Sequence, residues 1–532
     1  MKKIVPYFSL LPVLFLSLWI VSPFFRPGFF ETHDGEWAIV RLAEMVREIK
    51  DWQIPPRWSD YLNHGYGYPL FSFTYPLPYY LGSLLRLFGL EYVSIIKLLF
   101  ASSVFLSGIT MFFLADQIAG RSGAILAWGF YLLSPYRMTD LYIRGSIGES
   151  LSFVFFPLIF YLSVLYAGNF HKLRLLVWLS LTLALLFLTH NVMGLLFFPF
   201  WLSYLTLLIR RKKLPFRQSI LLILKPAVLA FSLAAFFIMP ALLEKKFLVM
   251  SQVPLADKSA NFLSWQDVFP LPSLNKGRPD FGLGPELAIA LSAAFLIFLR
   301  KKFRMPASFF LSAFLLTLFL VTPGSLLVWQ LPLLSSVDFP WRISGLIVFF
   351  AALSISFLKF NKTAYFLGII LLLSAVFRQI TSVEKLNKIV KKDDYYLTND
   401  ATTTSADELM PVWVKTKPTE RYNEKAEIIK GEGDLSDIKY NSKEASFFVR
   451  TKTEVKFRLN TIYYPGWFMT DNGKPLGFEY DNELGVMEAN VARGDHFIKA
   501  SFRETPARLA ADILSMGAFA YCIILFIRRK NA

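Results

Sequence analysis

The chain has 532 residues, of which 55% are hydrophobic, and its formal net charge is +17. Its apolar residues gather in runs long enough to cross a hydrocarbon core, which takes about 20 helical residues, so the composition excludes a soluble globular protein. The positive residues fall in short clusters between these runs and not along one polar face, which excludes nucleic acid as a partner. The single cysteine, Cys522, excludes an internal disulfide and a cysteine-based metal site.

The first apolar run follows Lys2 and Lys3 and covers residues 4–25. No small-residue cleavage site follows it, which favours an uncleaved signal anchor over a secretory signal that is removed. Together the apolar runs predict a polytopic α-helical membrane protein with about twelve transmembrane helices. The predicted spans are residues 4–25, 93–117, 123–136, 150–168, 172–189, 191–209, 217–239, 285–299, 306–322, 341–358, 362–377 and 507–527.

Residues 69–90 are apolar enough to form another span, but they contain Pro76, Pro78 and Arg86. The positive-inside rule decides against a crossing. If this segment lies on the outer surface, the basic clusters all fall on one face: Lys2-Lys3, Arg121, His171-Lys172-Arg174, Arg210-Arg211-Lys212-Lys213, Arg300-Lys301-Lys302-Arg304, Lys359-Lys362 and Arg528-Arg529-Lys530. We therefore predict a multi-pass protein of the plasma membrane with both termini in the cytoplasm, and a helix at residues 69–90 that lies at the headgroup level.

The first outer loop, residues 26–92, begins with polar side chains in the stretch "THDGE", namely His33, Asp34 and Glu36. Residues 36–50 show helical spacing, which places Asp34 at the N-cap of a helix resting on the membrane. Capping is one interpretation of Asp34. The other is a catalytic base at the membrane surface, since a second acid nearby would raise its pKa into a useful range.

Further polar residues stand in the first loop and at the predicted outer ends of later spans. Each has a plain alternative, such as solvation, helix packing or anchoring at the membrane interface. Arg342 is also suited to clamp a phosphate, because a guanidinium offers paired donors to an oxyanion. The candidates are Arg57 and His64, then Asp140, Arg144 and Glu149, and finally His190, Glu244, Asp338 and Arg342.

Several catalytic signatures are absent from the sequence. It has no Walker loop, no G-x-G-x-x-G, no G-x-S-x-G and no H-E-x-x-H. Soluble-nucleotide, serine-hydrolase and zinc-protease functions therefore lack support. Hard divalent cations prefer oxygen ligands, so Mg²⁺ or Mn²⁺ at His33, Asp34 and Glu36 remains open.

Residues 378–505 have a different pattern. Within them, apolar and polar residues alternate between turn signals at 471–473 and 493–495, which predicts a small antiparallel β-sandwich outside the membrane. Tyr463, Tyr464 and Trp467 have two interpretations. They form either a sugar-binding platform or part of a core or an interface.

Two acidic motifs stand at corresponding positions after spans: "THDGE", with Asp34, after the first span and "YIRGSIGES", with Glu149, after the third. In this arrangement the chain resembles the GT-C class of integral-membrane glycosyltransferases. The resemblance implies a GT-C-like fold and a polyprenyl-phosphate-linked sugar donor that is used on the outer face. The metal-dependent branch of that class has a D-x-D spacing, whereas this chain has Asp34-Gly35-Glu36, which leaves the metal open.

Two narrower resemblances cover parts of the chain. The stretch that begins "HDGEWAIVRLAEMVREIKDW" and ends "YPLPYYLG" is similar to a bacterial multi-pass family labelled 6-pyruvoyl-tetrahydropterin-synthase-related membrane proteins. The soluble pterin enzyme uses histidine-bound zinc, and this chain has no such histidine cluster. The tail that begins "YYPGWFMTDNGKPLGFEYDNELG" is similar to the extracellular end of membrane proteins that glycosylate wall teichoic or lipoteichoic acids.

We predict a membrane glycosyltransferase that moves a sugar from a polyprenyl-phosphate donor to an extracytoplasmic acceptor, with inversion. A lipid or glycolipid transporter of the cell envelope, or a non-catalytic assembly protein, is the alternative. The expected parts are a transmembrane domain (1–377), a β-rich domain (378–505) and a last helix with a cytoplasmic tail (506–532). The predicted catalytic residues are Asp34, Glu36 and Glu149, and the predicted substrate-binding residues are His33, Arg57, His64, Arg144, His190, Glu244 and Arg342.

Overall fold

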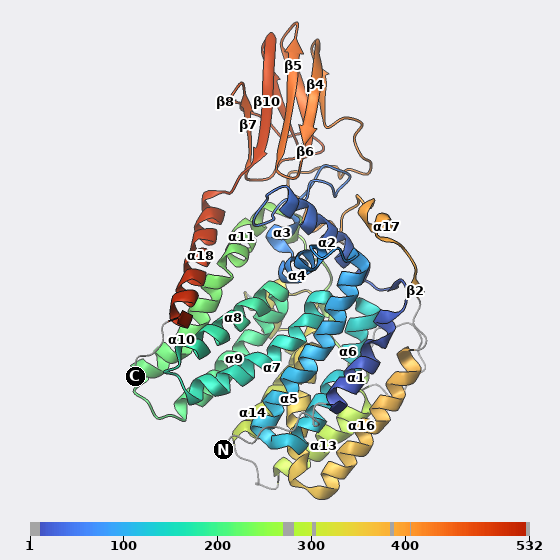
Figure 1. Ribbon diagram of the computed structural model, residues 1–532, viewed down its shortest axis with the longest axis vertical. Coiled ribbons are helices and arrows are strands. Elements are labelled where there is room, and N and C mark those ends of the chain that lie inside the picture. The colour runs from blue at the N-terminus through green and yellow to red at the C-terminus, as the bar shows by residue number, and fades with distance from the viewer. Residues whose placement is uncertain are drawn as a thin grey trace.

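The structure is a computed structural model that describes residues 11–269, 281–299, 305–332, 334–383, 388–404 and 406–527. A bundle of apolar helices carries a β domain at one end (Figure 1). Within the described residues, six helices are long and apolar enough to cross a membrane, and four shorter apolar helices accompany them. The chain is therefore a membrane protein, while the number of about twelve crossings stays a prediction. The basic clusters at 2–3, 300–304 and 528–530 lie outside the described residues.

The apolar runs are helical because hydrocarbon offers no partner to backbone polar groups, which a helix satisfies within one segment. Gly120, with φ of 72°, interrupts the longest helix, so this helix comprises two parts that overlap the predicted spans 93–117 and 123–136. The bundle helices are α1 (Leu11–Val21), α5 (Tyr92–Leu133), α7 (Ile147–Gly168), α8 (Leu173–Thr189), α9 (Asn191–Arg210), α10 (Phe216–Leu233), α11 (Ala235–Glu244), α13 (Pro285–Leu299), α14 (Met305–Leu320), α15 (Ser344–Ile355), α16 (Lys362–Val383) and α18 (Pro506–Ile527).

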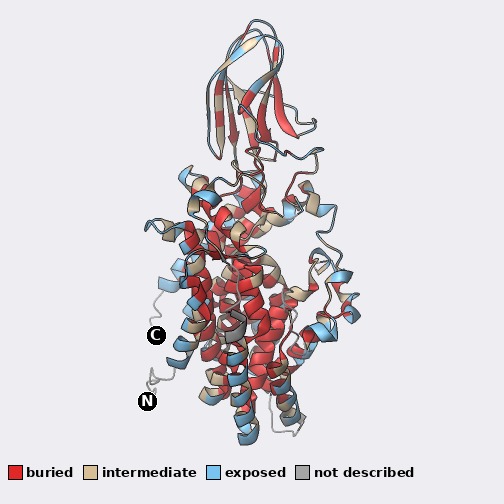
Figure 2. Ribbon diagram, turned by 90° about the vertical axis from the view of Figure 1, so that its right-hand side faces the viewer, coloured by how far each residue is buried: buried red, intermediate tan, exposed pale blue. Residues whose placement is uncertain are grey.

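Burial separates central helices from peripheral ones (Figure 2). The apolar segment that contains α15 is 89% buried within the protein, whereas that of α18 is only 28% buried. Helices α5, α7 and α15 pack against one another at the centre. The peripheral helices expose large apolar side chains, including Phe366 and Phe519, and such a surface requires a lipid environment.

Residues 69–90 form two short helices, α3 (Leu70–Phe73) and α4 (Leu77–Arg86). The ten residues of α4 extend about 15 Å, half of a hydrocarbon core of about 30 Å. Together with α2 (Gly35–Lys50), they lie at the end of the bundle beneath the β domain (Figure 1). That the segment rests on the outer membrane surface stays a prediction.

The β domain consists of two antiparallel sheets, so the predicted antiparallel β-sheet domain is confirmed. One sheet has the strand order β4-β5-β10-β7-β8 and the other has the order β3-β6-β9. The Phe447 and Phe457 rings, one from each sheet, lie 5.3 Å apart in the core between them. The strands are β3 (Ala426–Lys430), β4 (Gly433–Tyr440), β5 (Glu444–Thr451), β6 (Val455–Ile462), β7 (Trp467–Asp471), β8 (Lys474–Pro475), β9 (Val486–Val491) and β10 (Gly494–Phe502).

The sequence placed the start of this domain too early. Residue 378 lies inside α16, and the first strand of the sandwich begins only at Ala426. Between them, residues 388–404, here named the strap, run along the first loop, residues 26–92. The strap pairs β2 (Lys388–Ile389) with β1 (Phe29–Phe30) and contains α17 (Asp393–Leu397).

The aromatic residues of the "YYPGW" stretch hold the β domain to the bundle. Tyr464 is fully buried and donates a hydrogen bond to Glu244 over 3.2 Å. The Trp467 ring meets the Trp58 ring of the first loop edge to face at 5.8 Å. Tyr463 stacks on Tyr480 at 4.1 Å. Tyr464 and Trp467 therefore belong to the interface with the bundle, whereas Tyr463 packs within the β domain, and the sugar-platform interpretation stays a prediction.

Ionisable groups are buried where α2 and the first loop meet the β domain. Burial raises the pKa of Glu44 to about 8 and holds that of Glu48 well above its ordinary value. Burial likewise raises the pKa of Asp60. The Lys425 ammonium donates to the carbonyl of Gly65 over 2.9 Å, and burial lowers its pKa to about 7. Each of these groups is therefore shifted toward its neutral form.

The surface position of residues 69–90 can be tested by labelling in intact cells. In a Cys522→Ser background, the variants Trp52→Cys and Glu91→Cys should both react with an impermeant maleimide, because both positions are exposed and flank a segment that does not cross. Lys212→Cys, at the opposite end of the bundle, should stay unlabelled until the cells are opened. Labelling at position 52 together with protection at position 91 would mean that the segment spans the membrane.

The substitution Glu44→Gln should stabilise the protein at alkaline pH. The folded state holds the Glu44 proton up to a pKa of about 8 and the unfolded chain only to about 4.5, so this group opposes folding increasingly as pH rises between these values. The melting temperatures of variant and wild type should coincide near pH 4.5. They should separate toward pH of about 8, where the variant melts at the higher temperature. The exposed Glu432→Gln should leave the profile as it is. Equal melting temperatures of the two proteins at pH of about 8 would contradict a buried Glu44 that retains its proton.

Candidate functional site

Backbone hydrogen bonds join the two acidic motifs of the sequence directly. The N–H groups of His33 and Asp34 donate to the carbonyls of Ile143 and Arg144 over 3.0 and 2.8 Å. The two carbonyls belong to the π-helical turn η3 (Asp140–Arg144), which follows α6 (Pro135–Thr139) and precedes α7. The start of α2 is therefore fixed against the start of α7, although the two segments lie more than a hundred residues apart.

Gly145 makes this close approach possible. Its φ of +64° is a left-handed conformation that suits glycine, and a Cβ at this position would lie 2.7 Å from the backbone nitrogen of Gly35. Both glycines come from the acidic motifs themselves, "HDGE" and "YIRGS". The two motifs therefore contribute the glycines that let the backbones approach closely, as well as the acidic side chains.

The Asp34 side chain occupies the N-cap position of α2 but makes no capping hydrogen bond. The Thr32 hydroxyl accepts the bond from the N–H of Gly35 instead, over 3.0 Å. The capping interpretation of Asp34 is therefore wrong. The carboxylate is half-buried and faces two tyrosines: desolvation raises the pKa of Tyr75 and Tyr79, and the negative charge of Asp34 adds to the shift.

A buried ion-pair network stands on the α7 side of this joint. Arg144 pairs with Asp140 over 3.0 Å and, more closely, with Glu149, while the Tyr136 hydroxyl donates to Glu149 over 2.9 Å. The Arg144 guanidinium also lies 4.4 Å from the centre of the Trp341 ring. Burial and the charge of Glu149 raise the pKa of Asp140. Glu149 is thus fully engaged by protein partners.

His190 connects the first loop to the helices. Its ring is buried at the start of α9 and stacks on Tyr75 with centroids 5.1 Å apart. Its Nδ1 accepts the backbone N–H of Met193, so in the neutral form the proton sits on Nε2. Burial lowers the pKa of His190, and the positive charges of Arg342 and Arg144 lower it further. The negative charge of Glu149 raises it in part. The imidazole is therefore neutral at physiological pH.

Arg342 differs from the other cations of this region, because its side chain contacts mainly aromatic rings. Its guanidinium lies 5.0 Å from the Phe339 ring centre and 5.5 Å from that of Trp341. Its Nε is buried without a hydrogen-bond partner among the described residues. The side chain is half-exposed, so part of its donor set is open to a ligand.

The remaining predicted residues of the first loop face other partners. Glu36 accepts a hydrogen bond from Tyr396 over 3.1 Å and pairs with Lys391 over 3.4 Å, which fastens the strap to α2. His64 pairs with Asp400 of the strap over 3.3 Å. His33 is exposed beside Asp34.

Arg57 and Glu244 form two clamps at the base of the β domain. Arg57 is buried, donates to the Phe236 carbonyl over 2.6 Å and pairs with Asp512 over 2.8 Å. Glu244 pairs with buried Arg508 over 2.7 Å. Both clamps hold α18 to the bundle, and their polar atoms are turned to protein rather than to a substrate.

Sequence reasoning missed the tyrosines at the site and the arginine behind them. Tyr75 and Tyr79 come from "FTYPLPYYLG", where two prolines among aromatics were the available signal. Arg41 of α2 donates from Nε to the Thr403 hydroxyl of the strap over 3.1 Å and acts electrostatically on both tyrosines. Nothing in the sequence near Arg41 indicated this role, because its partner Thr403 lies 362 residues further along the chain.

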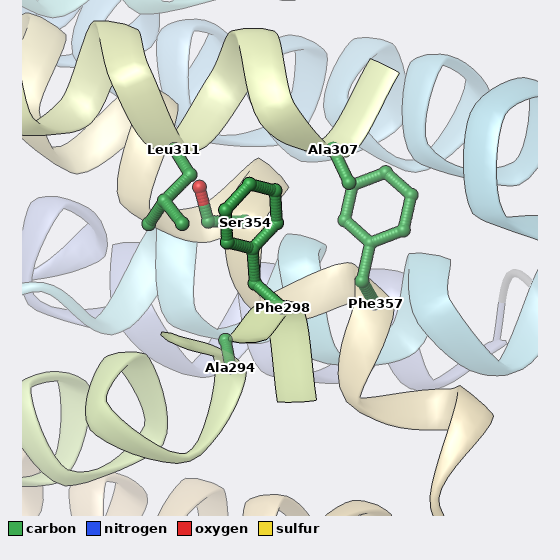
Figure 3. A pocket seen from close by; sticks show the side chains of 6 residues that line it. All are labelled: Ala294, Phe298, Ala307, Leu311, Ser354 and Phe357. Carbon is green, nitrogen blue, oxygen red and sulfur yellow. The ribbon is translucent and has the colours of Figure 1, made fainter. Parts of the chain in front are cut away.

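Among the described residues, no three His, Cys, Asp or Glu side chains come close enough to hold a metal ion. The donor set of His33, Asp34 and Glu36 does not converge, because Glu36 is turned to the strap. A small cavity of about 10 Å³ lies between α13, α14 and α15 (Figure 3). Its only polar lining group, the Ser354 hydroxyl, is bonded to Phe350, so this cavity is no substrate site.

No protein-family model matches this chain. An uncharacterised protein of Lactococcus lactis subsp. cremoris (strain MG1363) is 26% identical over 264 residues, which cover 48% of this chain and 42% of that protein. The crystal structure of the Archaeoglobus fulgidus oligosaccharyltransferase, tethered with an acceptor peptide containing the NVT sequon, aligns at 13% identity and a TM-score of 0.44, over 78% of this chain and 62% of that one. The alignments cover less than two thirds of the length of the Lactococcus protein and of the Archaeoglobus protein. Identities and a TM-score as low as these establish neither the family nor the function of this chain.

The Glu244 clamp should affect stability strongly. Glu244→Ala leaves the buried guanidinium of Arg508 without its carboxylate, a change that typically costs about 3–5 kcal/mol. The variant should therefore unfold at a clearly lower temperature in detergent. Asp481→Ala, which breaks the exposed pair with Lys415 over 2.7 Å, is the matched control and should melt like wild type. A Glu244→Ala protein with unchanged melting would show that the clamp does not hold the domain.

Proposed function

We propose that this chain is a membrane glycosyltransferase that transfers a sugar from a polyprenyl-phosphate donor to an extracytoplasmic acceptor. The observation that carries the proposal is the half-buried Asp34 carboxylate, which caps nothing and is fixed by backbone bonds beside η3 at the end of the bundle. The apolar bundle suits a lipid-linked donor, because the phosphate of such a donor lies at the headgroup level, and α2, α3 and α4 lie at the end of the bundle next to the β domain (Figure 1), where we propose that this level runs.

In the proposed reaction, Asp34 is the general base. It removes the proton of the acceptor hydroxyl as the acceptor oxygen bonds to the anomeric carbon of the donor. The bond from that carbon to the phosphate oxygen breaks in the same displacement, which inverts the anomeric centre. The products are the glycosylated acceptor, polyprenyl phosphate and a protonated Asp34, which returns its proton to water.

Arg342 is proposed to receive the leaving phosphate. Negative charge grows on the phosphate oxygens as the glycosidic bond breaks, and preorganised donors stabilise that charge in the transition state. Arg342 has a buried Nε without a partner among the described side chains and backbone, and it lies beside His190, whose Nε2–H is a second donor. Arg144 and Glu149 satisfy each other, so we assign them to holding η3 and not to contact with the donor.

The decisive variant is Asp34→Asn. It removes the basicity of the side chain while keeping its shape, and Thr32 still caps α2. Turnover should fall by roughly 10²–10⁴-fold, the usual contribution of a general base, with membrane level and melting temperature unchanged. The measurement is release of polyprenyl phosphate from a panel of polyprenyl-phosphate sugars incubated with purified protein, which also separates transfer from transport.

Two companion variants sharpen this experiment. Glu36→Gln alters the neighbouring acid, which pairs with the strap, and should keep the rate within a few-fold of wild type. Arg342→Lys keeps the charge but loses the paired donors, so it should weaken donor use as well as rate. Full activity of Asp34→Asn with a donor that wild type accepts would end the assignment of Asp34 as the base.

A further inference from the structure

An apolar groove opens between α8, α10 and α18 at the end of the bundle away from the β domain. These three helices lie side by side (Figure 1) and touch one another. The groove encloses about 190 Å³. Its lining is apolar throughout and comprises Val177, Trp178, Leu181, Leu233, Phe519, Cys522, Ile523, Phe526 and Ile527.

The dimensions of the groove suit one hydrocarbon chain in one leaflet. The α18 residues that line it run from Phe519 to Ile527, which at 1.5 Å per residue is about 12 Å. One leaflet contributes about half of the 30 Å hydrocarbon core. An apolar groove that is left unfilled costs its walls dispersion contacts, which a hydrocarbon chain would restore.

A cation stands at the mouth of the groove. Arg174 is exposed at the first turn of α8, and its Nε donates to the carbonyl of Phe526 over 3.3 Å. Its guanidinium lies 4.9 Å from the centre of the Phe526 ring, and that ring in turn meets Trp178 edge to face at 6.0 Å. Within the part of the chain that the structure describes, the terminal NH₂ groups of Arg174 have no hydrogen-bond partner, so they are donors for a headgroup phosphate at this level.

We propose that the groove binds one anionic phospholipid from the leaflet opposite the β domain. One acyl chain lies between Trp178, Leu181 and Phe519, and the phosphate pairs with Arg174. The lipid fills the gap between α18 and the bundle, where α18 itself contributes little burial. It thereby fastens the helix that carries the β domain.

Quenching of tryptophan fluorescence by brominated lipid tests this site. Full-length protein is placed in phosphatidylcholine vesicles with a small share of brominated phosphatidylglycerol, and the Trp178 signal is taken as the difference between wild type and Trp178→Phe, since the chain has 12 tryptophans. Brominated phosphatidylglycerol should quench Trp178 about five-fold more than its share of the lipid predicts, the factor expected of one basic side chain at the surface. Brominated phosphatidylcholine should show no such excess.

Two variants and one control identify the cause of the preference. Arg174→Gln should abolish the preference for the anionic lipid, and Cys522→Phe, which fills the groove, should reduce quenching by both lipids. Arg86→Gln is the matched control, because Arg86 also donates to a backbone carbonyl, at 2.6 Å, and lies over a ring, at 4.6 Å, but away from the groove. Quenching in proportion to the lipid share in wild type, or an unchanged preference in Arg174→Gln, would overturn the proposal.

Discussion

The arrangement of the bundle end next to the β domain depends on the pair of backbone hydrogen bonds from His33 and Asp34 to the turn before α7. Backbone groups in a low-dielectric region must be paired, so this joint is rigid in a way that a contact between two long side chains is not. It fixes the direction in which α2 leaves the bundle. The strap and the β domain are then built upon α2, through Glu36 and through Arg41.

A second constraint explains why so many charged residues near the β-domain end of the bundle pair with other protein groups. A charge buried beside a membrane is tolerated only when it is paired and hydrogen-bonded. Arg57 and Glu244 meet this demand with partners in α18, and Arg144 meets it within η3 and α7. Such residues look alike in sequence to residues that bind a substrate, because both kinds stand at the outer ends of spans. Only the location of the partner separates them.

The sequence predicted what is local. Apolar runs identified the bundle helices, and alternation identified the β domain. The prolines and Arg86 at residues 69–90 argued against a spanning helix, and the segment forms two short helices. What depends on long-range contacts escaped it. The partners of Arg57 lie more than 150 residues away, and the strap pairs with the first loop from beyond α16. Even the local capping of α2 was misjudged, since Thr32 and Asp34 are both good acceptors and only the backbone geometry selects between them.

The balance of charge around the joint bears on what the site attracts. Asp140 and Glu149 are bonded to Arg144, so this network presents no excess positive charge. His190 is neutral because burial lowers its pKa. Arg342 is then the cation whose charge is directed mainly at aromatic rings, which solvate it weakly compared with a carboxylate. A cation with such weak partners stabilises most an anion whose charge grows during the reaction. The phosphate released in the proposed transfer would be such an anion.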